Sequence, residues 1–352
     1  MTSSNLLIEV RDLRVDFKLF EGEVHALEGV DFDIKLGRSL GVIGESGCGK
    51  SVTAQSIMRI LPSPPGKIVD GQILLYGADG NTTNLLGLEA SGRQMRRIRW
   101  KDIAMIFQEP MTSFSPMYTI GRQIIEGIEI HMPELGQKPT RERAIDMLAK
   151  VGIPQPKRLI DVYPHQLSGG MRQRAMIAMA LSCSPRLLIA DEPTTALDVT
   201  IEAQILELLK SLQAEFGMSM MYISHDLAVV GEMADEIMVM YLGQVMERAT
   251  TDELFAEPLH PYTKALWRSI PRIDVNQDRL VPIAGALPSP FTKQSGCPFV
   301  SRCEQKIDGL CDQQRPPMIE ITKTHQVSCF LYQDQPAQLI ATPDIPVHTK
   351  TS

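Results

Sequence analysis

The chain has 352 residues, 43% of them hydrophobic and 22% charged, which suggests about two domains with ample core. A formal net charge of −7 and only 5% aromatic residues disfavour nucleic-acid binding, which normally needs basic excess or aromatic stacking platforms. No run reaches the roughly 18–20 apolar residues of a membrane helix, and the N-terminus lacks a secretory pattern. We therefore expect a cytosolic chain whose six cysteines are free thiols or metal ligands.

The first third of the chain is predicted to contain two kinds of strand. Alternating apolar and polar residues predict half-buried antiparallel strands at 6–10, 13–17 and 30–34. A nearly continuous apolar run at 40–43 predicts a strand covered on both faces, followed by a helix at 51–61. A Pro/Gly cluster then ends that helix, and 103–107 is another buried strand.

The rest of the chain divides into segments that differ in hydrophobic pattern and proline content. Residues 116–182 show helical patterns and few strand signals, so we expect an all-helical insert. Buried strands at 187–190 and 218–223 flank an amphipathic helix, and the alternation predicts an α/β core with a largely parallel sheet. After residue 256 prolines become dense, which predicts a first domain at 1–256 and a small cysteine-containing module at 257–352 that ends in a loose tail.

A phosphate-binding loop is predicted between the strand at 40–43 and the helix that follows it. The pattern G-x-x-x-x-G-K-[ST] is matched by Gly44, Glu45, Ser46, Gly47, Cys48, Gly49, Lys50 and Ser51. Glycines let successive N–H groups point at an anion, and the helix dipole favours negative charge at the same place. Lys50 would reach the β and γ phosphates, and Ser51 would offer its hydroxyl to Mg²⁺. A chance match turns up on the order of once in a hundred such chains, and the strand–loop–helix setting makes it rarer.

Two carboxylates follow a second buried strand. Leu187–Ala190 leads directly into Asp191 and Glu192, and strand ends are where α/β sheets present ligand chemistry. Asp191 would orient Mg²⁺, and Glu192 would polarise the attacking water as general base. An Asp-Glu pair alone is more often a solvated turn, but the apolar strand and the phosphate loop favour catalysis.

These motifs, with one more, resemble the ATP-binding-cassette (ABC) ATPases. The segment Leu167, Ser168, Gly169, Gly170, Met171 is similar to the family signature LSGGQ and lies between the loop and the acidic strand end. Met171 replaces the usual Gln, a variant familiar in the family's peptide importers. The resemblance implies a P-loop NTPase fold with an antiparallel β subdomain and a helical subdomain. It also implies that this segment caps the γ-phosphate held by an opposite subunit.

Other positions match the family in order. Gln108 resembles the Q-loop residue that senses Mg²⁺ and the γ-phosphate, Asp198 the D-loop, and His225 the switch histidine. Phe17 is the first candidate for stacking on adenine, and Phe20 is the second. The implied catalytic residues are Glu192, His225, Lys50 and Gln108, and the implied Mg²⁺ ligands are Ser51, Gln108 and Asp191. The implied ATP-binding set is Phe17, the loop Gly44–Ser51, Val52, Gln108 and Asp191.

The C-terminal module narrows the resemblance. His260-Pro261-Tyr262-Thr263, followed by a proline-rich extension, resembles oligopeptide and dipeptide importer ATPases, and nickel importers share parts of it. Four cysteines, at Cys297, Cys303, Cys311 and Cys329, are separated by five, seven and seventeen residues. These gaps lack the close pairs typical of structural zinc. The resemblance implies a [4Fe–4S] cluster, with zinc or four free thiols as alternatives; Cys48 and Cys183 are not expected to be ligands.

The implied function is an ATP-hydrolysing, energy-coupling subunit of a bacterial peptide importer. It would use ATP and Mg²⁺ at the cytoplasmic face of the inner membrane. Its implied partners are a second homologous ATPase, in a heterodimer, two permeases and an extracytoplasmic peptide-binding protein. Alternatives are an importer of nickel or another solute, an exporter subunit, a non-hydrolysing regulatory module and a non-transport ABC ATPase. DNA-repair members carry long coiled-coil inserts, whereas about 60 residues separate Gln108 from Ser168. A translation-factor member would need two cassettes.

Overall fold

The computed structural model describes residues 5–108, 114–195, 197–269, 283, 285–292 and 294–334. The chain forms two compact units: unit 1 comprises Met1–Val245 and Leu287–Lys293, and unit 2 comprises Met246–Ala286 and Gln294–Ser352. The predicted division after residue 256 therefore falls inside unit 2. Residues 246–256 belong there because strand β10 pairs with a strand from the C-terminal module. The tail predicted to be loose lies outside the described residues from 335 onward.

An antiparallel sheet in unit 1 begins the fold. Its strand order is β2-β1-β4-β5, with bounds Gly22–Lys35, Leu6–Leu19, Gly66–Tyr76 and Thr82–Asn84. The three short strands predicted within 6–35 are therefore two long ones, which is a correction. β1 stays continuous because its register shifts between Val10 and Leu13, where Asp12 has φ +43°. Ile8 and Val10 are buried before this bulge and Leu13 and Val15 after it, so one extra residue returns the side chains to the same buried face.

A parallel sheet forms the centre of unit 1. Its strands run in the order β9-β3-β8-β7-β6, and every neighbouring pair is parallel. The bounds are Glu236–Tyr241, Ser39–Ile43, Ser219–Ile223, Leu187–Asp191 and Ile103–Ile106. β3, β6, β7 and β8 are buried along their whole length, as their continuous apolar runs predict. Because the strands are parallel, the loops after their carboxyl ends gather at one edge of the sheet.

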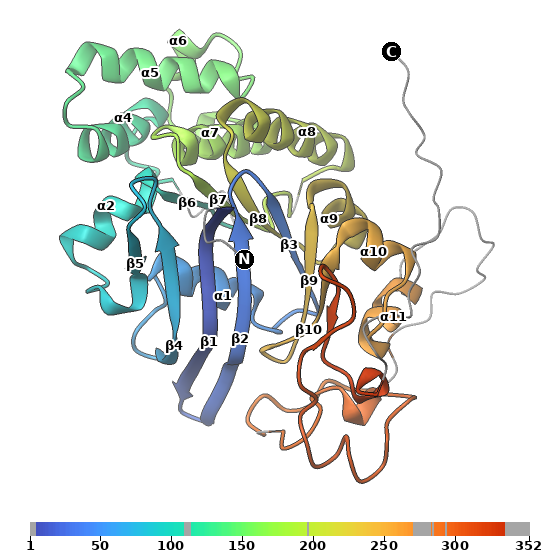
Figure 1. The fold of residues 1–352 in the computed structure, drawn as a ribbon. Helices are drawn as coiled ribbons and strands as arrows, with labels where there is room; N and C mark the ends of the chain where they lie inside the picture. Colours follow the sequence, from blue (N-terminus) through green and yellow to red (C-terminus); the bar gives the residue numbers. More distant parts are fainter. Residues whose placement is uncertain are drawn as a thin grey trace. The chain divides into compact units, whose positions relative to one another are not determined.

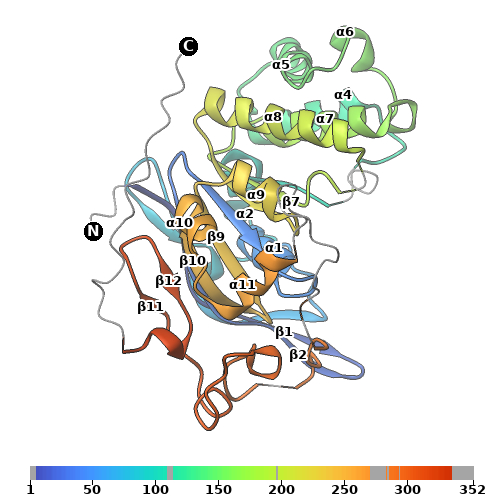
Figure 2. The same ribbon diagram turned by 90° about the vertical axis from the view of Figure 1, so that its right-hand side faces the viewer.

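The helices of unit 1 divide into two groups (Figure 1). Helices beside the sheets are α1 Lys50–Met58, α2 Arg93–Lys101, α8 Val199–Phe216 and α9 Leu227–Met233, with the short turn η2 Leu85–Gly87. The described elements between 114 and 182 are all helical: α4 Ile120–His131, α5 Gln137–Lys150, α6 Pro156–Leu159, η3 Pro164–Gln166 and α7 Gly169–Leu181. α7 and α8 run next to each other (Figure 2), and a side chain at Gly170 would meet Ile201 at 3.0 Å.

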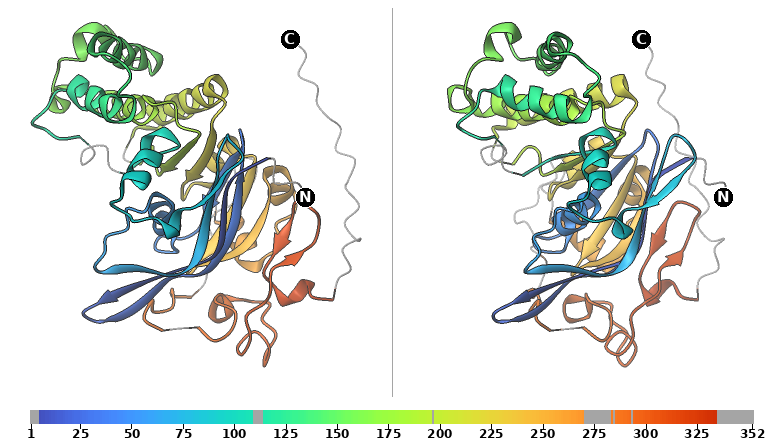
Figure 3. Two further views of the ribbon diagram at one scale, coloured as in Figure 1. Left: turned by 60° about the vertical axis from the view of Figure 1, so that its left-hand side comes forward. Right: turned by 90° about the vertical axis from the view of Figure 1, so that its left-hand side faces the viewer.

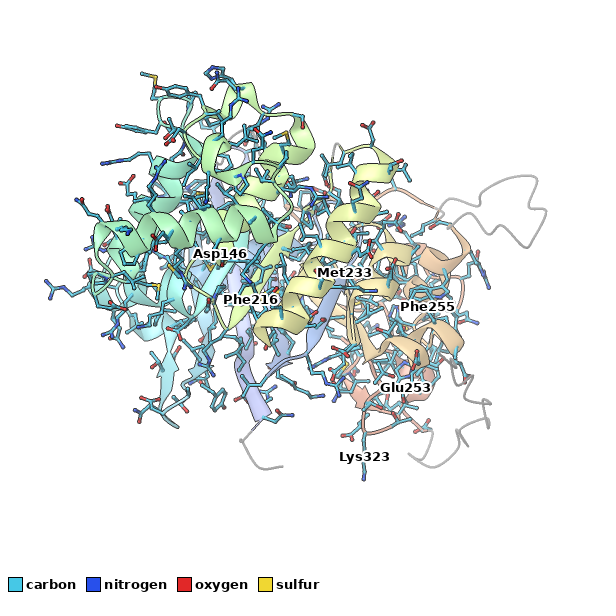
Figure 4. The ribbon with its side chains drawn as sticks, turned by 90° about the horizontal axis from the view of Figure 1, so that it is seen from above. Asp146, Phe216, Met233, Glu253, Phe255 and Lys323 are labelled. Atoms are coloured by element: carbon cyan, nitrogen blue, oxygen red, sulfur yellow. The ribbon has the colours of Figure 1, made fainter. Side chains whose placement is uncertain are left out.

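One hydrophobic core links the two sheets of unit 1 with α1. Ile8 and Val10 of β1, Ile57 of α1 and Ile189 of β7 are all fully buried in this cluster. Lys150 on α5 lies over the ring of Phe216, the last residue of α8, at 5.8 Å. Asp146, also on α5, interacts electrostatically with Lys150, and Figure 4 labels it close to Phe216. These contacts hold the helical segment against α8. Among the described residues no helix is long and apolar enough to cross a membrane.

Unit 2 is a small sheet with short helices. Its elements are β10 Gln244–Thr250, of which the last five residues belong to unit 2, α10 Thr251–Ala256, α11 Pro261–Arg268, η4 Val300–Arg302, β11 Ile319–Glu320, β12 Gln326–Val327 and η5 Phe330–Tyr332. β12 pairs with β10 and β11, both antiparallel (Figure 2).

Two glutamates bind the parts of unit 2 together. Fully buried Glu247 accepts from the backbone N–H groups of Leu259 and His260 and contacts Nε2 of His325 at 2.7 Å. Glu253 caps α10 and accepts from Thr322 and Thr324, which flank Lys323 (Figure 4). Polar contacts thus supplement a core cluster that includes Leu259, Ile321 and Val327.

Candidate functional site

The loop between β3 and α1 curls where only glycine fits. Gly44 has φ +153°, and a side chain there would overlap the carbonyl oxygen of Met240 and lie 2.6 Å from Sγ of Cys48. Gly49 has φ +105° and caps the start of α1. A side chain at Gly49 would come within 2.9 Å of the Ala26 carbonyl, so the loop packs closely on β2.

Lys50 is buried at the centre of this loop, with an exposed fraction of 6%. Its Nζ donates to the carbonyl oxygens of Gly44 at 2.7 Å and Glu45 at 3.1 Å. An ammonium held at the first turn of a helix, beside a curled glycine-rich backbone, makes a site for phosphate oxygens. Cys48 is a buried thiol whose pKa is raised by burial, and it is part of the loop's packing.

A hydrogen bond between Ser51 and Asp191 joins the start of α1, which follows β3, to the end of β7. The Ser51 hydroxyl donates to Oδ1 of Asp191 at 3.1 Å, although the two residues are 140 positions apart. Burial raises the pKa of Asp191, while the Ser51 hydrogen bond and the Lys50 charge lower it and Glu192 raises it further. A hydroxyl and a carboxylate side by side are oxygen ligands of the type that Mg²⁺ prefers.

Glu192 is contacted by three side chains from three loops. Nε2 of Gln108, after β6, and the hydroxyl of Thr195 donate to its Oε2 at 2.9 and 3.0 Å. Nδ1 of His225, after β8, lies 3.4 Å from its Oε1. The Glu192 side chain is 16% exposed and His225 is 69% exposed. A carboxylate held in this way at a strand end can accept a proton from a water molecule.

The backbone also fixes Glu192. Its φ of +46° is the left-handed region, which a glutamate rarely adopts, and its N–H donates to the carbonyl of Ile223 at 2.9 Å. The strained turn directs the side chain away from the run of β7. Such strain at a candidate catalytic residue supports a functional role for the turn.

The other predicted residues lie outside this hydrogen-bonded group. Ser168 caps α7 by accepting from the N–H of Met171 at 3.3 Å, and Gly169 has open space where a side chain would stand. Leu167 is buried beneath them, and Asp198 is exposed at the start of α8. Their roles stay predictions.

The residues predicted to contact adenine and Mg²⁺ differ in burial and in their hydrogen-bond partners. Phe17 is partly buried and packs against the main core, and Phe20 is fully exposed near the end of the β1–β2 hairpin. Val52 also packs against the core. Of the predicted Mg²⁺ ligands, Ser51 and Asp191 are joined, whereas Gln108 binds Glu192. The structure thus puts Gln108 beside the proposed base.

The four C-terminal cysteines line one small cavity in unit 2, together with His260 and Phe330. Cys297 and Cys311 are buried, and Cys303 and Cys329 are partly exposed. The pKa of Cys297 is raised to about 12 and that of Cys329 to about 11, mainly by burial and in smaller part by the other cysteines of the cavity. Within the described residues, no group of three or more His, Cys, Asp or Glu side chains is arranged to hold a metal ion.

Family models match both parts of the chain. The model described as "ABC transporter" matches residues 15–195, and the model described as "Oligopeptide/dipeptide transporter, C-terminal region" matches 246–311. The chain belongs to the ABC transporter family. It is an ABC ATPase, and its C-terminal region is the type found in the oligopeptide/dipeptide branch.

Similar proteins agree with this membership. A probable peptide ABC transporter ATP-binding protein of Sinorhizobium fredii, y4tR, is 50% identical over 93% of this chain and 95% of its own length. The dipeptide transport ATP-binding protein DppD of Bacillus subtilis is 47% identical over 94% and 96%. The dimeric ATP-binding cassette MJ0796, solved in a post-hydrolysis state with ADP and Pi, has 26% identity and a TM-score of 0.60, covering 70% of this chain and 99% of that one. The ABC cassette fold expected from the motifs is thereby confirmed.

Sequence reasoning missed Thr195 and Gln173. Thr195 follows the acidic pair by three residues, so its position near Glu192 was open to prediction from proximity alone. Gln173 lies just after the ABC signature, and its buried amide donates to the carbonyl of Pro193. Gln173 therefore ties the signature helix α7 to the turn that carries Glu192, a contact that no spacing in the sequence indicates.

We predict that Thr195→Val lowers kcat for ATP hydrolysis by about tenfold with little change in KM, because it removes a hydrogen bond to a charged group that orients Glu192. Thr195→Ser should restore most of the rate. The matched control is Thr200→Val, at an exposed position of α8. Steady-state phosphate release measures both parameters. Unchanged kcat in Thr195→Val would show that this hydroxyl does not position the base.

Proposed function

We propose that the chain is the ATP-hydrolysing, energy-coupling subunit of a bacterial importer for di- and oligopeptides. The observation that carries this proposal is the hydrogen-bonded group around Glu192, next to the Lys50 loop, in a chain whose C-terminal region matches the oligopeptide/dipeptide model. The names of the relatives in Sinorhizobium and Bacillus support peptides as cargo. Import of nickel or another small solute is the alternative within transport.

The active site is completed by a second ATPase subunit. Ser168 and Gly169 are exposed at the N-terminus of α7, where backbone N–H groups and the helix dipole favour an anion. These residues are separate from the Lys50 loop of their own chain, so they are suited to the γ-phosphate held by a partner. The similar cassette MJ0796 is dimeric. We propose a heterodimer with a homologous ATPase, with Asp198 at the seam.

In the proposed reaction, Lys50 and the loop amides hold the β and γ phosphates, and Ser51 and Asp191 hold Mg²⁺. Glu192 accepts a proton from the attacking water as the γ-phosphoryl group is transferred. His225, whose Nδ1 lies 3.4 Å from Oε1 of Glu192, would contact the γ-phosphate beside the base. Phe17 is the proposed platform for adenine.

Gln108 links this chemistry to transport. It follows β6 directly and donates to Glu192, so a displacement of the loop after β6 changes the orientation of the base. ATP binding stabilises the closed dimer and product does not, so the cycle opens and closes the pair. Two permeases bind near the Q-loop and the helical insert at the cytoplasmic face of the inner membrane. An extracytoplasmic binding protein delivers the peptide.

The test of this function is growth on peptides. In cells lacking the gene, the wild-type chain should restore growth on peptides as the source of a required amino acid, and Glu192→Gln should not. Glu192→Gln should still bind ATP but hydrolyse it at least about a hundredfold more slowly, because the general base is lost. Free amino acid should support all strains equally. Peptide-dependent growth in the Glu192→Gln strain would refute the assigned base, and growth without the gene would refute peptides as the cargo.

We also propose that Cys297, Cys303, Cys311 and Cys329 hold a [4Fe–4S] cluster. The support is geometric: all four line one cavity, and the N–H of Cys297 donates to the carbonyl of Cys311 at 2.8 Å. Each sulfur has a backbone N–H partner, from Phe299, Gln305, Ile307 and Leu331 respectively. Such bonds to sulfur are a feature of Fe–S sites and tune their potential.

Four thiols around one cavity supply the cysteine ligand set that a [4Fe–4S] cluster takes. Burial raises the pKa of Cys297 and Cys329, so a bound cation must compensate the charge when these thiols ionise as ligands. The gaps of five, seven and seventeen residues between the cysteines lack the close pairs typical of structural zinc, which disfavours zinc as the occupant. When bound, the cluster would staple a unit that has a small core.

We predict that the chain purified without oxygen is brown and contains iron and sulfide in equal amounts, about four of each per chain. Cys329→Ser should lose colour and iron. Cys183→Ser, at a buried cysteine outside the cavity, should keep both. Metal and sulfide analysis measures this. Colourless, iron-free protein would contradict the cluster, and one equivalent of zinc in its place would establish the zinc alternative.

A further inference from the structure

A strongly basic cleft lies on unit 1, away from the residues that contact Glu192. It has a volume of about 480 Å³ and is lined by Arg93, Arg96, Arg97 and Lys101 from α2, and by Ile130, His131, Pro133 and Glu134 from the end of α4 and the turn after it. Figure 3 shows α2 directly beside α4. The lining carries four permanent cations against one carboxylate, on a chain whose net charge is −7.

The cations share one side of α2. Met95 and Ile98 face the core, whereas Arg93, Arg96 and Arg97 are spaced by three and four residues and are exposed. Nearby like charges on one helix face repel, so this arrangement costs helix stability. The nine residues of α2 contain five cations and no carboxylate. An anion bound to α2 would offset this repulsion and would explain why the cations are gathered on one helix.

Arg99 differs from its neighbours because its guanidinium forms hydrogen bonds within the chain. Its guanidinium donates to the carbonyls of Met58, Arg59 and Ala90. In the part of the chain that the structure describes, Arg93 and Arg96 form no side-chain hydrogen bond or ion pair, and Arg97 interacts electrostatically with Asp102 without bonding to it. Their donors are thus available to an anion.

The two walls of the cleft are fixed to each other. α2 leaves helical geometry at Arg99, and Trp100 has φ +73°. The ring of Trp100 stacks on His131 at 5.7 Å, and it lies where any side chain at Gly127 of α4 would collide. Burial lowers the pKa of His131, so near neutral pH the positive charge comes from the arginines and Lys101.

One wall is basic, and the other presents Ile130 and Pro133 together with His131 and Glu134. Ile130 is 64% exposed beside the cations, and Pro133 is exposed next to it. Arginine forks bind phosphate bidentately, and an adjacent apolar surface suits the acyl–headgroup boundary. Four basic residues are in the range of clusters that bind anionic lipid surfaces. The wall with Ile130 and Pro133 belongs to the helical insert, near which the proposed function places the permeases. This inference therefore rests in part on that membrane location.

We propose that the cleft binds the phosphate headgroup of an anionic membrane lipid. The occupant is a phosphodiester or phosphomonoester at the cytoplasmic surface, held by Arg93, Arg96 and Arg97, with Ile130 against its apolar side. The contact orients the ATPase on the bilayer independently of its permeases.

The test is flotation of the full-length chain, alone and without nucleotide, with vesicles of phosphatidylcholine that contain or lack phosphatidylglycerol. The wild type should bind only the anionic vesicles, and added salt should weaken binding. The triple variant Arg93→Gln, Arg96→Gln, Arg97→Gln should bind at least about tenfold more weakly. The control triple Lys138→Gln, Lys157→Gln, Arg158→Gln removes the same charge from exposed sites on α5 and α6 and should bind like the wild type.

The outcomes separate the proposal from its rivals. Unchanged MgATP binding shows that both triple variants are folded. Equal losses in both triples, equal binding to neutral vesicles, or no binding by the wild type would overturn the proposal. Normal flotation of the cleft variant, with loss of copurification with permeases in lipid-free detergent, would assign the cleft to an acidic protein segment instead. Because no peptide or hydrolysis is involved, this result does not depend on the growth test above.

Discussion

The parallel direction of β3, β6, β7 and β8 is the constraint on which the active site depends. Because these strands point the same way, the loops that follow them meet at one sheet edge. Lys50 and Ser51 come from the first loop, Gln108 from the second, and Glu192 and His225 from the other two. The hydrogen bond from Gln108 to Glu192 is possible only in this arrangement. A reversed strand would remove a participant in the reaction.

The same geometry explains which parts of the site the sequence could predict. Lys50, Ser51, Asp191 and Glu192 lie in short motifs whose spacing reflects local backbone shape, so they were identified from the sequence, and the structure joins Ser51 to Asp191 across 140 residues. Thr195 and Gln173 were not, because their roles depend on side-chain direction and on the packing of α7. The long strand β1 was predicted as two strands because a bulge at Asp12 changes the phase of the hydrophobic pattern. The first half of β2 was missed because most of its side chains are only partly buried. The boundary near Met246 depends on long-range pairing of β10 with β12, for which the sequence has no local signal.

Buried polar groups have different roles in the two units. In unit 1 they converge on a sheet edge and are available to ligands, as the half-exposed group around Glu192 illustrates. In unit 2, Glu247 satisfies two backbone N–H groups and His325 without access to solvent, so its role is to hold the module together. The cysteine cavity is intermediate, because its four thiols are buried or partly exposed and line one cavity. A bound cluster would resolve their mutual repulsion on ionisation.

The measurement that tests the account most directly is equilibrium binding of MgATP to the purified chain and to Lys50→Ala. The account holds that Lys50, fixed by the carbonyls of Gly44 and Glu45, supplies the charge that grips the phosphates. It predicts that Lys50→Ala binds MgATP at least about tenfold more weakly, while Lys67→Ala, outside the loop, binds like the wild type. Equal affinity in the wild type and Lys50→Ala would contradict it.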